Sequence, residues 1–408
     1  MPVWNAYRLH LVRAGVLAFA SSLIWTAMIV YQVSFVGLQP LQLVLIGTVM
    51  EITILVFEIP TGIVADLYSR RLSFIIGVVT MGISYLMQGL IPIFEAILLA
   101  QVVWGLGFTF TSGAYEAWVV DELGQEQAGQ AFIRASQVER IASIAGIILC
   151  GVVGSVDIRL PIVAGGVVVL LSGVMLIFIM PETGFTPTPR SERATYQKMW
   201  ATFRDGARMI QGRPVLMNII AVSLFYGLYS EAWDRLWQTH LINGVGLPQF
   251  LALPAIAWFT LITLGESILG FIGAGIMARR LDMRDGDRLR RALIRLNQVM
   301  IVSLVVYGLA QSFWVAIAAF YAFTLARGLS GPVFDTWTNQ NIEPGVRATV
   351  LSMKSQMDAL GEIAGGPPLG YVGQRSVPLA FGVSAALLAP AVWLLRRMGH
   401  LTRTRTPA

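Results

Sequence analysis

Long apolar segments recur along the whole chain, and they restrict its possible folds more than any other feature. A helix that spans a membrane needs about 20 mostly apolar residues. Twelve segments meet this requirement, namely residues 12–36, 40–66, 72–91, 94–119, 131–155, 160–180, 214–242, 249–278, 291–311, 313–339, 348–372 and 377–396. The sequence therefore predicts an all-α integral membrane protein with twelve transmembrane helices.

The content of charged residues agrees with a lipid environment. Of the 408 residues, 13% are charged and 56% are hydrophobic, whereas about a quarter of the residues in soluble domains are charged. The net charge of +6 comes from basic residues in short blocks between apolar segments, a pattern that indicates topology and not binding to nucleic acid. The single cysteine, Cys150, excludes a disulfide framework and a cysteine-based zinc site. We expect no cofactor and no metal.

The basic residues also predict the orientation in the membrane. With a cytoplasmic N-terminus, alternate loops carry nearly all of them, and only Arg159 and Arg375 fall on the other side. The basic loops contain Arg70 and Arg71, Arg190 to Arg213, Arg279 to Arg291, Arg347 and the tail from Arg396. Cytoplasmic loops carry such an excess of Lys and Arg. We therefore expect a protein of the cell's inner (cytoplasmic) membrane with both termini in the cytoplasm.

An internal repeat predicts two related halves. Residues 115–154 match residues 334–373 without gaps, so that Glu116 aligns with Asp335, and Glu139 with Asp358. Six spans separate the copies, and both must therefore cross the membrane in the same direction. The prediction is two parallel, pseudo-symmetric six-helix bundles, residues 1–180 and 214–408, with a cytoplasmic linker at 181–213. The later part of the linker, with Trp200, Phe203 and Ile210, favours a short helix on the membrane surface.

Two motifs resemble a known family. The sequence Gly62-x-x-x-Asp66-x-x-x-Arg70-Arg71 is similar to the loop signature of the major facilitator superfamily of transporters. The stretch from Tyr115 to Glu122, together with Phe57-Glu-Ile-Pro-Thr-Gly, resembles its bacterial drug-efflux branch, which includes macrolide and tetracycline exporters. The resemblance implies a substrate site between the halves and a cytoplasmic gate held by the aspartate of the signature. We assign to this gate Gly62, Asp66, Arg70, Arg71, Glu116 and Asp335.

Ionisable residues inside the predicted spans are the candidates for proton coupling. Such a residue costs at least about 2.5–3.5 kcal/mol to insert, so it normally faces the bundle interior or a wet cavity. The predicted proton carriers are Glu51, Glu58, Glu139 and Asp358. The alternative role is structural, as in Glu231 and Arg235, which lie one helical turn apart and are predicted to pair. The predicted charge partners are Arg140, Glu231, Asp234, Arg235, Glu266, Arg327, Lys354 and Glu362.

Aromatic residues in the spans indicate the kind of substrate. Trp25, Tyr31, Trp104, Tyr226, Tyr229, Trp233 and Trp258 are candidates for binding it. The alternative is that they pack between helices or lie at the membrane interface. A cavity with aromatic and acidic residues suits amphiphilic, often cationic compounds.

The sequence favours a monomeric secondary transporter that exports such compounds in exchange for protons by alternating access. It contains no phosphate-binding loop that would indicate ATP as the energy source. A proton-coupled importer or a lipid mover on the same fold is the alternative. A receptor or an intramembrane enzyme fits less well, because His10, His240 and His400 lie near span ends or termini without a catalytic motif.

Overall fold

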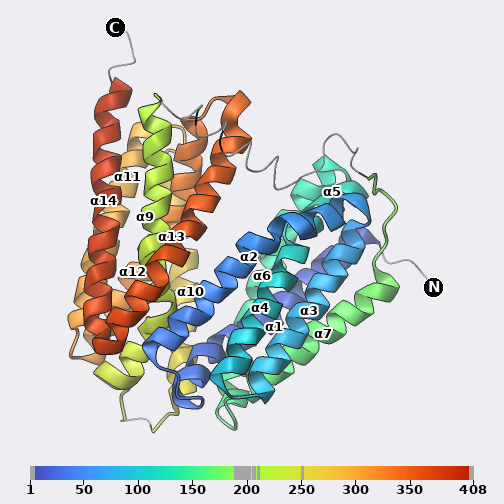
Figure 1. Cartoon of the computed structure of the whole chain (residues 1–408), viewed down its shortest axis with the longest axis horizontal. Helices are drawn as coiled ribbons and strands as arrows, with labels where there is room; N and C mark the ends of the chain where they lie inside the picture. The colour runs from blue at the N-terminus through green and yellow to red at the C-terminus, as the bar shows by residue number, and fades with distance from the viewer. Residues whose placement is uncertain (1–4, 188–203, 205–207, 209–211, 250–251, 404–408) are drawn as a thin grey trace. The chain divides into compact units, whose positions relative to one another are not determined.

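In the computed structural model, the described part of the chain consists mainly of long helices (Figure 1). The structure describes residues 5–187, 204, 208, 212–249 and 252–403. Within these residues no strand is present. The predicted surface helix with Trp200, Phe203 and Ile210 lies outside the described residues.

The first half of the chain contributes α1 to α7. Their bounds are Ala6–Ser34, Pro40–Leu67, Arg70–Leu90, Phe94–Thr111, Ala114–Leu123, Gln125–Gly154 and Leu160–Ile179. The fourth predicted span, 94–119, is divided into α4 and α5 by a break at Ser112 and Gly113. Gly113 has a φ of 71°, which side chains with a Cβ rarely adopt, and the chain therefore changes direction there.

The second half contributes α9 to α14. The helices are Pro214–Thr239 (α9), Ala255–Arg280 (α10), Gly286–Leu309 (α11), Phe313–Gln340 (α12), Arg347–Arg375 (α13) and Val377–Arg403 (α14). A π-helical segment, His240–Val245, extends α9, and a 3₁₀ turn, Pro344–Val346, precedes α13.

The predicted set of twelve transmembrane helices is confirmed. Eleven spans among the described residues are long and apolar enough to cross a membrane, with α4 and α5 together forming one of them. The remaining predicted span, 348–372, is α13. This helix has 29 residues, more than the about 20 that a membrane span needs. It carries the charged residues Arg347, Lys354, Asp358, Glu362 and Arg375 and is not among the eleven apolar spans.

The helices form two compact units. The N-unit contains α1, residues 49–67 of α2, α3 to α7, and residues 253–264, which include the start of α10. The C-unit contains residues 39–48, α9, the rest of α10, and α11 to α14. Both α2 and α10 are thus shared between the units.

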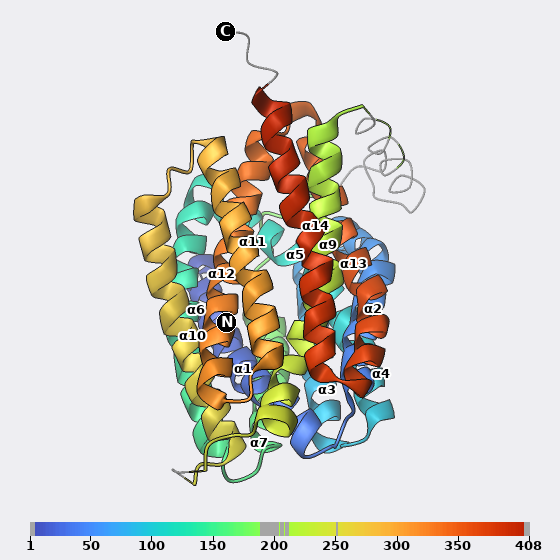
Figure 2. The same ribbon diagram turned by 90° about the vertical axis from the view of Figure 1, so that its left-hand side faces the viewer.

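The same pattern of helix packing occurs within each unit. In the N-unit α1 packs on α6 and α7, while α3 packs on α4 and α7. In the C-unit α9 packs on α13 and α14, while α11 packs on α12 and α14 (Figure 2). Because these are corresponding helices of the two halves, the pattern agrees with the internal repeat in the sequence.

Candidate functional site

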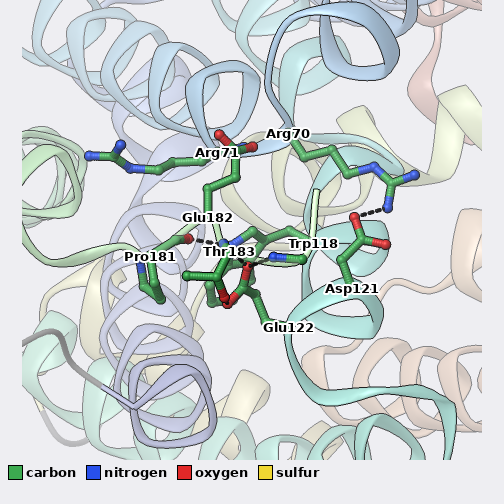
Figure 3. A network of polar contacts seen from close by, with 9 residues as sticks. Arg70, Arg71, Trp118, Asp121, Glu122, Pro181, Glu182 and Thr183 are labelled. Carbon is green, nitrogen blue, oxygen red and sulfur yellow. Dashed lines mark hydrogen bonds and ion pairs between the residues drawn. The ribbon is translucent and has the colours of Figure 1, made fainter. Parts of the chain in front are cut away.

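The turn between α2 and α3 is tied to α5 and to residues 181–184 by a polar network (Figure 3). Arg70 makes an ion pair with Asp121 of α5. Glu182 accepts hydrogen bonds from the Ser69 hydroxyl at 2.6 Å and from the backbone N–H of Arg71 at 2.9 Å. A carboxylate beside the first turn of α3 also meets the positive end of the helix dipole. The network therefore fixes both arginines of the signature within the N-unit.

Two further contacts hold residues 181–184 on α5. The indole N–H of Trp118 donates to the carbonyl of Pro181 at 2.7 Å. Glu122 accepts from the hydroxyl of Thr183 at 2.7 Å and from the backbone N–H of Gly184 at 2.8 Å. The sequence did not indicate that Glu122 and Glu182 join this network, because their partners lie 61 and 111 residues away, respectively.

The other predicted gate residues lie around this network or apart from it. Gly62 is in α2 with open space where a Cβ would be. Asp66 is half-buried near the end of α2 and, among the described residues, makes no ion pair or hydrogen bond. Glu116 is exposed in the first turn of α5. Asp335 belongs to the C-unit, where it pairs with Lys354.

The predicted proton carriers of the N-unit occupy different environments. Glu139 of α6 lies 3.8 Å from Arg13, whose guanidinium stacks 3.7 Å from the ring centre of Tyr115. Glu51 is half-buried and Glu58 is exposed, both on α2. Arg140, next to Glu139, is exposed.

Aromatic candidates of the N-unit form one cluster. Trp25 meets Tyr85 and Trp104 edge to face, with ring centres 6.3 and 6.0 Å apart, respectively. Trp104 donates a hydrogen bond to the Tyr85 hydroxyl at 2.7 Å. Tyr31 lies elsewhere and is buried, with its hydroxyl donating to the carbonyl of Gln88 at 2.6 Å. Trp258 is buried at the start of α10.

A cavity of about 240 Å³ within the C-unit collects most of the predicted residues of that half. Its lining consists of Ser223, Tyr226, Tyr229, Ser230, Met300, Arg327, Ser330, Gly331, Phe334, Asp335, Lys354, Asp358 and Glu362. The residues come from α9, α11, α12 and α13, of which α9 and α13 are more than a hundred positions apart in the sequence. The cavity therefore depends on the tertiary fold.

Both cations of this cavity have carboxylate partners. Arg327 of α12 makes an ion pair with Asp234 of α9, one of whose contacts measures 2.8 Å. Lys354 of α13 pairs with Asp335 of α12. The side chain of Asp358 makes no ion pair or hydrogen bond within the described part of the chain. Asp358 therefore differs from Asp234 and Asp335, each of which is paired with a basic side chain.

Close approach of α9 and α13 sets the position of Asp358. A Cβ on Gly227 would lie 1.9 Å from the carbonyl oxygen of Asp358, far inside van der Waals contact. Gly361 and Gly365 of α13 approach the carbonyls of Leu224 and Leu228 in the same way. Because these positions lack side chains, the backbone at Asp358 lies directly against α9, which carries Tyr226 and Tyr229.

Asn297 is a site residue that was not predicted from the sequence. Its side-chain nitrogen donates to the Tyr226 hydroxyl and to the carbonyl of Leu293, both at 2.8 Å. A carbonyl only accepts hydrogen bonds, so this contact fixes which atom of the amide is the nitrogen. The oxygen of Tyr226 must then accept, and its proton is left to donate elsewhere. Asn297 is fully buried, but Arg295 and Gln298 lie beside it in the predicted span 291–311, so the sequence did not single it out.

The remaining predicted residues of α9 and α10 do not line the cavity. Glu231 and Arg235 lie 3.5 Å apart, and their predicted pairing is confirmed. Trp233 packs against Tyr307, Phe320, Phe323 and Phe381. Glu266 is half-buried on α10. Among the described residues, no three His, Cys, Asp or Glu side chains gather closely enough to hold a metal ion.

The comparison with known families agrees with this architecture. The sequence model of the protein family described as Major Facilitator Superfamily matches residues 14–366 of this chain. The chain belongs to this family. An uncharacterized MFS-type transporter of Bacillus subtilis (strain 168), YxaM, is 23% identical over 366 residues, which are 87% of this chain and 85% of YxaM. The protein is accordingly a multi-pass membrane transporter, and its fold and relatives are those of transporters, not enzymes.

Solved structures of other transporters share this fold. The nucleoside transporter NupG has a TM-score of 0.77 at 12% identity, covering 97% of this chain and 99% of NupG. A bacterial homolog of the human lysosomal transporter Spinster, in an inward-facing and occupied conformation, has a TM-score of 0.73 at 14% identity. The alignment covers 99% of this chain and all of that one. At such identities the likeness concerns the fold alone.

Proposed function

We propose that this transporter exports amphiphilic organic cations in exchange for protons, and that Asp358 is the group that binds them in turn. The proposal depends on one observation, the carboxylate of Asp358 in the C-unit cavity beside two cations that are already paired. Alternating access by the two halves of the family's fold would expose the site to each side of the membrane.

The charges explain why exchange is the expected mode. Arg327 and Lys354 are balanced by Asp234 and Asp335, so the ionised Asp358 adds a negative charge to a cavity that Glu362 also lines. Such a charge is costly at membrane depth. Either a proton or a cationic substrate removes that cost, and the two compete for the same carboxylate. A site with this competition exchanges one for the other.

The rings of the cavity favour a cation with an apolar body. Tyr226, Tyr229 and Phe334 line the space beside Asp358. The Lys354 ammonium already lies 4.9 Å from the centre of the Phe334 ring, within the range of a cation–π contact. Because binding pockets for whole drug-sized ligands measure about 300–1,000 Å³, we infer that this cavity of about 240 Å³ holds the charged part of the substrate.

The remaining assignments belong to the same proposal. We place the protein as a monomer in the inner membrane with both termini cytoplasmic, as the one-sided basic loops indicate. With an inward proton gradient, exchange then drives the cation out of the cell. The ion pair of Arg70 and the contact of Arg71 with Glu182 support a role of the signature turn in gating. Glu51, Glu58 and Glu139 remain further candidates for proton transfer, and the N-unit aromatic cluster for contact with the substrate.

Likeness to solved structures does not select the substrate. The structures include a nucleoside transporter, a peptide transporter and a human organic anion transporter, MFSD10. Chemically different substrates thus go with one fold, and the choice among them must come from the side chains of the site. In this chain those side chains favour a cation.

The test uses the purified protein in proteoliposomes, with tetraphenylphosphonium as the probe and the membrane potential clamped by potassium and valinomycin. An acidic vesicle interior should drive uptake of the probe against its own gradient. Asp358→Asn should reduce this uptake at least about tenfold, as expected when a buried charged contact is lost, while Asp358→Glu should retain part of it. The control, Asp157→Asn, removes a carboxylate from the loop before α7 and should transport like the original protein.

Three results would count against the proposal. Uptake of the probe in the same direction as the flow of protons, instead of the opposite direction, would indicate an importer. Absence of gradient-driven uptake in the original protein would exclude this class of substrate. Equal uptake by Asp358→Asn and Asp157→Asn would exclude Asp358 as the exchanging group.

A further inference from the structure

An apolar groove of about 490 Å³ lies on the N-unit over α1, between α6 and α7. It is lined by Leu11, Val12, Gly15, Val16, Phe19, Val138 and Val168. None of these side chains carries a charge or a hydrogen-bonding group. Val12 is 48% exposed, so the groove opens to the surroundings of the protein. In a multi-pass membrane protein these surroundings are lipid chains.

Small residues on α1 produce the groove. α6 contacts α1 closely at Gly15, where a Cβ would lie 3.0 Å from Val138. α7 contacts α1 further along, where Gly165 meets the side chain of Ile24 and the carbonyl of Ala20. Between these two contacts, Val16 and Phe19 line the space over α1. The groove is therefore a consequence of helix packing, independent of the C-unit cavity.

Two arginines lie at one end of the groove. The rings of His10 and Phe132 are 5.3 Å apart, Gly15 faces Val138, and Gly146 faces the carbonyl of Phe19. Residue numbers thus increase together on α1 and α6, and the two helices run parallel. Arg8 precedes Val12 by four residues and Arg134 precedes Val138 by four, so each shares a helix face with a lining residue.

Both arginines are available to a ligand. Arg8 and Arg134 are exposed, and among the described residues neither makes an ion pair or a hydrogen bond. Arg13, which comes five positions after Arg8 on α1, is different because its side chain pairs with Glu139 at 3.8 Å. Glu139 of α6 is thereby engaged, whereas the guanidinium groups of Arg8 and Arg134 have no ion-pair partner among the described residues.

We propose that this groove and its two arginines bind an anionic phospholipid of the bilayer. One acyl chain lies along the apolar lining, and the phosphate meets Arg8 and Arg134 about one helical turn beyond it. Guanidinium groups bind phosphate oxygens through paired hydrogen bonds, which an ammonium group does not match geometrically. The chain accounts for the apolar lining and the headgroup for the two arginines, so one ligand explains both features.

The headgroup is tested by titrating the detergent-purified full chain with dioleoyl phosphatidylglycerol or dioleoyl phosphatidylcholine and counting bound lipids by native mass spectrometry. The original protein should bind phosphatidylglycerol more tightly. The double variant Arg8→Gln/Arg134→Gln should weaken phosphatidylglycerol binding about tenfold, because each arginine near a lipid surface contributes to attraction of anionic lipids. Binding of phosphatidylcholine should not change.

A matched control removes the same charge elsewhere. Arg291 and Arg295 are exposed and one turn apart on α11, and Arg291→Gln/Arg295→Gln should bind phosphatidylglycerol like the original protein. Val16→Trp, which fills the groove, should weaken binding of both lipids. Thermal unfolding of each variant checks that it is folded.

Equal binding of the two lipids by the original protein would overturn the proposal. So would equal effects of the two double-arginine variants, or unchanged lipid binding in a folded Val16→Trp variant. None of these readouts depends on transport, so the result is independent of the proposed function.

Discussion

Two ion pairs of α9 differ in how much water their side chains meet. The side chains of Glu231 and Arg235 are 5% and 9% exposed, whereas those of Asp234 and Arg327 are 41% and 35% exposed. Removing one partner of a buried pair leaves a charge that neither water nor a neighbour compensates. For the exposed pair, water replaces much of what is lost. The two pairs are therefore expected to respond differently to substitution.

The first prediction concerns the buried pair. Glu231→Gln should lower the free energy of unfolding by about 3–5 kcal/mol, since Arg235 remains charged in an apolar environment. Glu231→Gln/Arg235→Met should recover most of this loss because no charge remains. Thermal unfolding of the purified protein in detergent measures both. Equal losses in the single and the double variant would contradict the explanation.

Some contacts of single residues could be predicted from the sequence and others could not. Glu231 and Arg235 are four positions apart in one helix, and helical geometry alone brings them together. Asp234 and Arg327 are 93 residues apart, and their pairing depends on how α9 and α12 pack. The same holds for Asn297 and Tyr226, which are 71 residues apart. The hydrophobic periodicity of single helices does not indicate which residues of different helices come into contact.

At the scale of elements, the contact between α9 and α13 determines the shape of the C-unit cavity. Gly227, Gly361 and Gly365 bring the two backbones together, and Asp358 lies within this contact. α13 continues as one helix through Pro367 and Pro368, although proline in a helix removes a backbone hydrogen bond. Packing against α9 through its glycines helps to stabilise this helix.

The second prediction concerns this contact. Gly227→Ala would place a Cβ 1.9 Å from the carbonyl oxygen of Asp358 and must push the helices apart, at a cost of about 1–3 kcal/mol or more. We expect a lower unfolding temperature and reduced proton-driven exchange. The matched control is Gly328→Ala on α12, where an added Cβ would meet no heavy atom within 4 Å among the described residues beyond its own stretch of helix backbone.

The control should be as stable as the original protein, or slightly more stable, since alanine favours helix. Similar unfolding temperatures for Gly227→Ala and Gly328→Ala would show that α9 and α13 have room to adjust.

Prediction of the elements succeeded where apolar length determines them and failed where the backbone breaks. Each of the twelve predicted spans corresponds to a helix or helix pair. The break between α4 and α5 was missed, because one positive φ at Gly113 leaves no trace in apolar periodicity. For α13, length was the better guide than hydropathy, since several of its charged residues face a cavity and not lipid.

At the scale of the whole molecule, α2 and α10 connect the two units. Residues 39–48 of the chain pack in the C-unit, where Gly47 lies against Glu231 and Arg235 and Thr48 lies against Gly366. The rest of α2 belongs to the N-unit. The internal repeat predicted equivalent halves, but it did not indicate that single helices are shared. In the proposed mechanism of alternating access, α2 would have to bend or residues 39–48 would have to leave α9 and α13.

The last prediction tests whether residues 39–48 depend on this close contact. A Cβ on Gly47 would lie 2.5 Å from a carboxylate oxygen of Glu231 and 2.7 Å from Nε of Arg235, so Gly47→Leu should prevent the segment from packing there. Thr48 is 5% exposed and the single native cysteine, Cys150, is buried. In a Thr48→Cys background, Gly47→Leu should raise the rate of labelling by a hydrophilic maleimide about tenfold, corresponding to an overpacking cost of about 1.4 kcal/mol. Gly275→Leu, placed where α10 has open space, is the control and should leave the rate of labelling unchanged. If the cysteine at position 48 is labelled equally slowly in the Gly47→Leu and Gly275→Leu variants, residues 39–48 stay on α9 without Gly47. Release of α2 is then not governed by this contact.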